Sequence, residues 1–229
     1  MSKRKIPLVP GEYYHIYNRG NNKQKIFFDE KDYERFIKCL YLCNTKKSFN
    51  FRDDIVDSEI DSFDFDRDNT LVSIGAWVLM PNHFHLYLTI PFSPRQGLGE
   101  NTISQFMLKL MTAYVSYLNK KYERTGGLFE GPFKSVHIEN NEQAKYLFSY
   151  IHLNPVKLIE PKWKENGIKN TKKVLNFLKS YKWSSYLDFK GEKRPQGKII
   201  TPKDFLIDFQ NTKDFDREIL DWLEYGEED

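Results

Sequence analysis

The chain has 229 residues, enough for one domain with a sizeable core or for a domain of about 150 residues with an appendage. No run approaches the roughly 18 apolar residues of a membrane span, and the first residues, MSKRKIPLVPG, lack the apolar segment of a signal peptide. We therefore expect a cytoplasmic protein rather than a membrane-spanning or secreted one.

The net charge of +3 conceals an uneven distribution of charged residues. Residues 1–100 carry 14 Lys and Arg against 14 Asp and Glu, residues 101–199 carry 18 against 8, and residues 200–229 carry 3 against 10. Lysines and aromatic residues are interleaved in the basic section, as on a polyanion-binding surface. A solvated basic face above an aromatic core explains the same pattern equally well. Charge alone therefore leaves nucleic-acid binding open.

Hydrophobic periodicity predicts the elements of the first half of the chain. Residues 12–20 alternate like a strand, and residues 29–44 have helical spacing after a suitable N-cap, Asp29. Residues 72–80 and 80–88 are rich in strand formers and flank the turn residues Pro81 and Asn82, which predicts a hairpin.

The second half is predicted to contain a long amphipathic helix over 102–123, a strand with an irregular middle over 127–140, and a helix over 141–155. The resulting order is strand, helix, strand, strand, helix, strand, helix. This order predicts an α+β fold, namely a ferredoxin-like split β-α-β-β-α-β arrangement with an antiparallel sheet covered on one face and an extra C-terminal helix.

Three segments fall outside this arrangement. Residues 53–68 hold eight acids against one base, within an insertion that spans 48–69, and residues 91–101 read as a loop. The chain is thus divided into a domain over 1–190, which includes the acidic insertion, and an acidic extension over 191–229. Apolar residues at near-helical spacing predict that this extension is helical.

The two cysteines do not indicate a metal cluster or a disulfide framework. Cys39 and Cys43 are four residues apart in the helix predicted over 29–44, and the chain has no other cysteine. We expect both to be reduced cysteines that are part of a helix, as in proteins of a reducing compartment.

The histidine pair in MPNHFHLYL, residues 80–88, is a candidate metal site. Alternation along a strand directs His83 and His85 to one face while Phe84 enters the core. Two imidazoles at a strand end, where ligands can reach them, suggest metal binding. A His-x-His pair alone is more often hydrogen-bonded structure, so the metal interpretation requires a third group.

The helix predicted over 141–155 supplies such a group. Tyr150 and Asn154 are four residues apart and project from one helical face, with Tyr146 one turn earlier and His152 directed elsewhere. An amide oxygen can ligate a hard cation, and a phenol can act as a nucleophile. Without the histidines, a tyrosine near a helix end is better explained by packing.

Together, MPNHFHLYL and YIHLNPVK resemble the signature of the single-tyrosine transposases of the HUH endonuclease superfamily, in particular the REP-associated tyrosine transposases. YHIYNRG near the start and WSSY at 183–186 resemble stretches that flank the core of that group. The resemblance spans residue 12 to about residue 190. The acidic insertion is longer than the family core needs, and the segment after about residue 195 matches no catalytic element.

The resemblance implies roles for four residues. His83 and His85 are the metal ligands, Asn154 is the third ligand where related enzymes often carry Gln, and Tyr150 is the nucleophile. The activity implied is cleavage and rejoining of single-stranded DNA, at hairpin-bearing or palindromic repeats, through a 5′-phosphotyrosine intermediate with Mg²⁺ or Mn²⁺ and no nucleotide cofactor.

The resemblance also implies a nucleoid-associated protein that is a monomer or homodimer, with no membrane partner. The residues expected to hold the DNA backbone are Arg19, Lys109, Lys120, Lys121, Lys134, Lys145 and Lys157.

Two alternatives from other functional classes remain. A metal-dependent phosphodiesterase using water would cleave DNA without forming an adduct, with Tyr150 purely structural. A non-catalytic DNA hairpin-binding protein would carry a decayed site, but the intact set of His83, His85, Tyr150 and Asn154 argues against decay.

Overall fold

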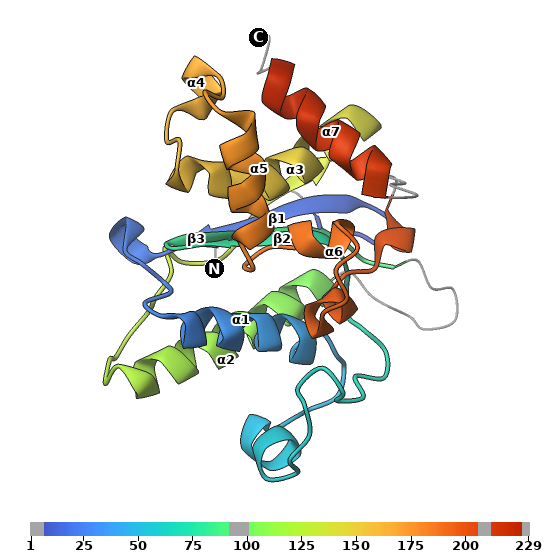
Figure 1. Cartoon of the computed structure of the whole chain (residues 1–229). Coiled ribbons are helices and arrows are strands. Elements are labelled where there is room, and N and C mark those ends of the chain that lie inside the picture. Colours follow the sequence, from blue (N-terminus) through green and yellow to red (C-terminus); the bar gives the residue numbers. More distant parts are fainter. Residues whose placement is uncertain (1–6, 92–100, 206–211, 226–229) are drawn as a thin grey trace.

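The computed structural model describes residues 7–91, 101–205 and 212–225. A four-stranded antiparallel sheet lies between two layers of helices, with the strand order β2-β3-β1-β4 (Figure 1). Its strands are β1 (Tyr13–Arg19), β2 (Ser73–Met80), β3 (His83–Thr89) and β4 (Lys134–Ile138). The predicted split β-α-β-β-α-β arrangement is confirmed.

One face of the sheet is covered by α1 (Glu30–Leu42) and α2 (Thr102–Lys121). Alternation along β3 directs Phe84, Leu86 and Leu88 into the core beneath these two helices. Helix α1 begins with a capping box, in which the side chains of Asp29 and Asp32 each accept a hydrogen bond from the other's backbone amide.

The opposite face is covered by helices from the C-terminal half of the chain (Figure 1). These are α3 (Asn141–Leu153), α4 (Trp163–Asn166), α5 (Thr171–Ser180), α6 (Tyr186–Phe189) and α7 (Thr212–Tyr225). The expectation of a sheet covered on one face is therefore wrong. The physical reason is visible in β2, where every residue is buried, because a continuous apolar run without alternation needs cover on both sides.

Short helical turns connect these elements. They are η1 (Asn21–Lys23), η2 (Arg52–Val56), η3 (Asn154–Leu158), η4 (Pro195–Ile199) and η5 (Pro202–Asp204). Residues 183–186, which flank the core in sequence, lie against the edge strand β2, where Ser184 forms a bridge with Val78. None of the described helices is long and apolar enough to cross a bilayer.

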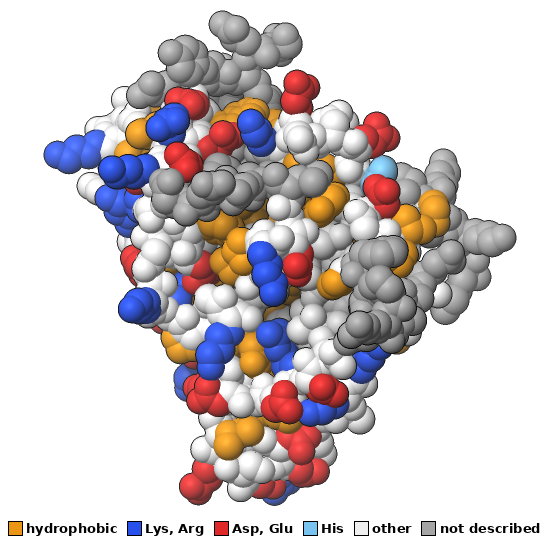
Figure 2. Space-filling view, turned by 90° about the vertical axis from the view of Figure 1, so that its right-hand side faces the viewer, with side chains coloured by type: hydrophobic (Ala, Val, Ile, Leu, Met, Phe, Trp, Pro, Cys, Tyr) orange, Lys and Arg blue, Asp and Glu red, His pale blue; other side chains and the backbone are white. Residues whose placement is uncertain are grey.

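The acidic insertion over 48–69 and the described part of the extension over 191–229 both pack against the helix layers. The insertion contains η2 and buries Ile55 and Phe63 against the α1–α2 layer, while its acidic side chains gather at the lower end of the molecule (Figure 2). Within the extension over 191–229, α7 packs on α3 and buries Phe215, Ile219 and Leu223. Most of the predicted loop over 91–101, and residues 206–211 and 226–229 of the extension, lie outside the described residues.

Candidate active site on the α3 face of the sheet

The two histidines of β3 point toward α3. Their ring centroids are 5.0 Å apart, and the rings are nearly perpendicular. Strand β3 lies between β1 and β2, so His85 is opposite Tyr17 on one side and Val78 on the other. His85 is buried, whereas His83, at the first residue of the strand, is half-buried. The pair therefore lies at the end of a central strand.

Helix α3 brings Tyr150 and Asn154 to the same place. The ring of Tyr150 lies 5.2 Å from that of His85, centroid to centroid. Asn154 is the C-cap of α3 and the first residue of the turn η3, and Pro155, which follows it, cannot continue the α-helix. His152 is directed away, as expected from its place on the helix, and its Nε2 atom lies 2.8 Å from the Ser185 hydroxyl.

The amide of Asn154 is unusual because it is buried without hydrogen bonds. The side chain is 1% exposed, and neither its oxygen nor its nitrogen has a hydrogen-bond partner among the described residues. It lies close enough to His83 and Tyr150 to affect the pKa of both side chains, although it forms no hydrogen bond of normal geometry with either. Leaving such a group unsatisfied costs about 1–3 kcal/mol, and the Asn154 amide is available to bind a polar ligand.

A third histidine, which sequence reasoning missed, completes the cluster. His15 of β1 lies with its Nε2 atom 2.8 Å from Nδ1 of His85. The contact joins residues 70 positions apart and depends on the pairing of β1 with β3. Alternation along 12–20 could have indicated that His15 and Tyr17 share one face of their strand, but it does not give the register of that strand against β3.

Burial keeps these imidazoles neutral. Desolvation lowers the pKa of His15 and of His83 to about 4, and it lowers the pKa of His85 well below its ordinary value. For His85, the neighbouring His15, His83 and Lys157 lower the pKa further. Neutral imidazole is the form that has a lone pair for a metal ion.

The phenol of Tyr150 has cations beside it. Burial raises its pKa, while Asn154 and the charge of Lys164 act in the opposite direction. The ammonium groups of Lys164 and Lys157 lie 5.0 and 5.3 Å from the centre of the ring. Positive charge at this distance stabilises a phenolate or an anionic group bound next to it.

The donor set fits a divalent cation. Across residues 7–91, 101–205 and 212–225, no three His, Cys, Asp or Glu side chains form a metal-binding group. The Nε2 atom of His85 and the Oδ1 atom of Asn154 are both buried without a partner among the described residues. Nδ1 of His83 lies 2.6 Å from the Asn82 side-chain oxygen, which leaves its Nε2 atom for a ligand.

The residues expected to hold DNA do not all lie at this site. Arg19 is opposite His83 in the β1–β3 pair and forms an ion pair with Glu130, and the ammonium group of Lys134 lies 6.0 Å from the Tyr17 ring. Lys157 lies beside Tyr150, and Lys145 is exposed on α3. The remaining lysines belong to α2, on the opposite face of the sheet, and are Lys109, Lys120 and Lys121.

The three α2 lysines have different surroundings. Lys120 is exposed. Lys109 donates hydrogen bonds to two backbone carbonyls, those of Thr45 and Lys47, and Lys121 forms ion pairs with Asp29 and Asp32. The structure does not bring these lysines together with Tyr150.

No protein-family model and no curated protein sequence matches the chain. Solved structures do match. One is a REP-associated tyrosine transposase bound to a REP hairpin, with a TM-score of 0.52 and 16% sequence identity, over 91% of this chain and 93% of that one.

Two further matches have TM-scores below 0.5 and carry no weight. They are a protein from Deinococcus radiodurans assigned as a transposase (TM-score 0.32, 14% identity, 64% of this chain and 92% of that one) and a bacterial tRNA(His) guanylyltransferase-like protein in complex with ATP (TM-score 0.40, 13% identity, 96% and 94%). At these identities the comparisons show a fold shared with the REP-associated tyrosine transposase, and nothing of the chemistry.

Proposed function

We propose that the protein is a metal-dependent DNA strand transferase that cleaves and rejoins single-stranded DNA through Tyr150. The observation that carries the proposal is the convergence of a tyrosine phenol with two neutral imidazoles and an unpartnered amide on one face of the sheet. The fold shared with a tyrosine transposase bound to a REP hairpin supports DNA as the substrate, with hairpin-bearing repeats as the first candidates.

His83, His85 and Asn154 are the residues that would hold the cation. Two imidazole nitrogens and one amide oxygen suit Mn²⁺ better than Mg²⁺, which prefers an all-oxygen shell. When bound, the cation polarises the scissile phosphate and offsets its charge. Three protein ligands would fill only part of the coordination shell of such a cation, which would leave room for phosphate oxygens.

Tyr150 acts as the nucleophile. Its phenolic oxygen forms a bond to phosphorus, the bond from phosphorus to the 3′-oxygen breaks, and the products are a 5′-phosphotyrosine and a free 3′-hydroxyl. The phenol loses its proton in this step, and the departing 3′-oxygen gains one. Lys157 and Lys164 favour the step because their charges stabilise the phenolate. The phosphodiester energy is kept in the covalent link, so the step can be reversed.

The test compares two tyrosines of one helix face. Tyr146 lies one turn before Tyr150 with its ring nearly parallel, 6.1 Å away, so Tyr146→Phe is a matched control for Tyr150→Phe. Each purified protein is incubated with single-stranded hairpin DNA and Mn²⁺, and covalent adducts are resolved on a denaturing gel. We expect an adduct with the parent and with Tyr146→Phe, and none with Tyr150→Phe. An undiminished adduct in Tyr150→Phe refutes the assignment.

Metal dependence is tested in the same assay. Chelator, or His83→Ala, is expected to abolish the adduct while hairpin binding in a gel-shift assay persists, because these changes remove phosphate polarisation and leave the lysines in place. Full activity in chelator contradicts the metal role.

A water-using phosphodiesterase is the second candidate, favoured by one observation. Burial raises the pKa of Tyr150, which disfavours the phenolate needed for attack. This alternative predicts cleavage without an adduct and with undiminished rate in Tyr150→Phe, so the same gel separates the two reactions.

A further inference from the structure

We infer that His15 is a positioning residue that fixes the tautomer and orientation of His85, so that the Nε2 atom of His85 offers a lone pair to a divalent cation. The inference rests on the proposed function, because it assigns a role in the metal site to a residue outside the ligand set. It is carried by the 2.8 Å contact between Nε2 of His15 and Nδ1 of His85.

The hydrogen atoms of this contact can be counted. A neutral imidazole carries one N–H, and only one hydrogen fits between two ring nitrogens 2.8 Å apart. If His15 donates, His85 carries its hydrogen on Nε2, and a buried N–H then lacks an acceptor among the described residues. If His85 donates from Nδ1, its Nε2 has a lone pair. The second arrangement is the one that can ligate a cation.

In His83, too, one ring nitrogen has a hydrogen-bond partner and the other is left for a ligand. The Asn82 side-chain oxygen lies 2.6 Å from Nδ1 of His83 and can only accept, so His83 also donates from Nδ1 and keeps Nε2 for a ligand. Two different partners, one on each histidine, therefore leave the same ring atom available.

The fold holds His15 firmly in this role. Strand β1 is hydrogen-bonded to β3 on one side and to β4 on the other, which fixes its backbone. The ring of His15 is packed against Tyr17, 4.9 Å away between centroids, and meets Tyr150 edge-on at 6.1 Å. A side chain supported by a central strand and by neighbouring rings can hold a ligand in one orientation.

The test measures Mn²⁺ binding by isothermal titration calorimetry, without DNA. His15→Leu keeps much of the bulk but removes the acceptor for Nδ1 of His85, and we expect affinity to fall 10- to 100-fold. His15→Gln places an amide oxygen near the former Nε2 position, and we expect it to recover affinity to within about threefold of the parent. The matched control is His137→Leu, because His137 contacts Glu12 rather than the site and should leave affinity unchanged.

A second measurement covers the case in which His15→Leu does not fold. Nitrogen-15 NMR of the ring atoms distinguishes the two neutral tautomers, and we expect His85 of the metal-free parent to carry its hydrogen on Nδ1 and to keep it there in His15→Gln. A parent that binds neither Mn²⁺ nor Mg²⁺ overturns the proposed function and the inference with it. If the parent binds, equal affinity in a folded His15→Leu, or hydrogen on Nε2 of His85 in the metal-free parent, overturns the inference alone.

Discussion

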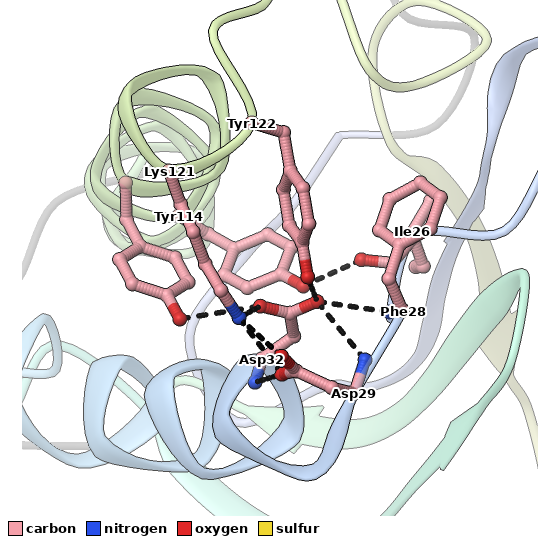
Figure 3. Close-up of polar contacts among 8 residues, drawn as sticks. Ile26, Phe28, Asp29, Asp32, Tyr114, Lys121 and Tyr122 are labelled. Atoms are coloured by element: carbon pink, nitrogen blue, oxygen red, sulfur yellow. Dashed lines mark hydrogen bonds and ion pairs between the residues drawn. The ribbon is translucent and has the colours of Figure 1, made fainter.

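Replacing Asp32 with Asn is expected to destabilise the protein more than any other single exchange of a carboxylate for an amide on α1. The Asp32 carboxylate is fully buried between α1 and α2 and accepts hydrogen bonds from five donors (Figure 3). These are the backbone amides of Phe28 and Asp29, the phenols of Tyr117 and Tyr122, and the ammonium group of Lys121 at 2.7 Å.

The magnitude follows from the burial of this ion pair. Removing one partner of a buried pair costs about 3–5 kcal/mol, because the other charge loses its compensation. Lys121 keeps Asp29 as a partner at 2.7 Å, so we expect the lower end, about 3 kcal/mol. The side chain of Lys121 is 24% exposed, so water replaces little of the lost interaction. For a chain of this size the loss corresponds to a melting temperature lower by roughly 6–12 °C.

Asp29→Asn is the matched control. Asp29 contacts the same lysine but is 48% exposed, and Asn caps a helix as well as Asp does. We expect a loss of at most about 1 kcal/mol, as for other exposed pairs. Both free energies are measured by equilibrium urea unfolding, with an unchanged denaturant slope as evidence that each variant unfolds in the same way. If Asp32→Asn costs no more than Asp29→Asn, burial does not govern the strength of this pair.

Three further predictions concern pH, salt and the C-terminal helix. Burial lowers the pKa of His152 from 6.5 to about 3. Between these two pH values, His152 is protonated in the unfolded chain and neutral in the folded protein. The free energy of unfolding should therefore decrease as the pH falls from 6.5 toward 3, by up to about 1.4 kcal/mol per pH unit from this residue. In His152→Gln, the free energy of unfolding measured in urea should depend less steeply on pH. Affinity for single-stranded DNA should decrease linearly with salt on logarithmic axes, by roughly 0.7 per phosphate neutralised, and Lys157→Ala should flatten that line; an unchanged slope removes Lys157 from the DNA surface. Deleting residues 212–229 exposes the apolar residues beneath α7, at a cost of roughly 1.5–3 kcal/mol per buried side chain. The melting temperature should therefore fall, while affinity for the DNA hairpin is not weakened. Lost binding in a truncated protein that has the melting temperature of the parent contradicts this prediction.

Local periodicity accounts for the parts of the site that could be predicted. His83 and His85 share a face because of the two-residue period of a strand, and Tyr150 and Asn154 share one because of the four-residue spacing of a helix. Each rule acts within a few residues, so the sequence is sufficient to apply it. The core strand order could be predicted because few topologies accommodate the observed order of elements.

Interactions between distant segments could not be predicted in the same way. The contact of His15 with His85 depends on the register of two strands far apart in the sequence, and no local pattern sets that register. The cover of the second sheet face depends on which apolar stripe of the C-terminal helices meets β2, a question of packing rather than periodicity. The lysines of α2 carry charge in the sequence, but only the fold shows that Lys121 contacts Asp32 rather than the site.

The register of β1 against β3 therefore determines the site as much as the histidines do. Tyr14 and Ile16 of β1 are buried beneath α1 and α2, and their burial directs His15 to the opposite face, beside His85. A slip of one residue would bring the side chains of Tyr14 and Ile16 to the α3 face and bury His15 in an apolar core. The apolar residues of β1 thus fix the position of the polar ones, and the stability of the core is what keeps the three histidine rings and Tyr150 in one place.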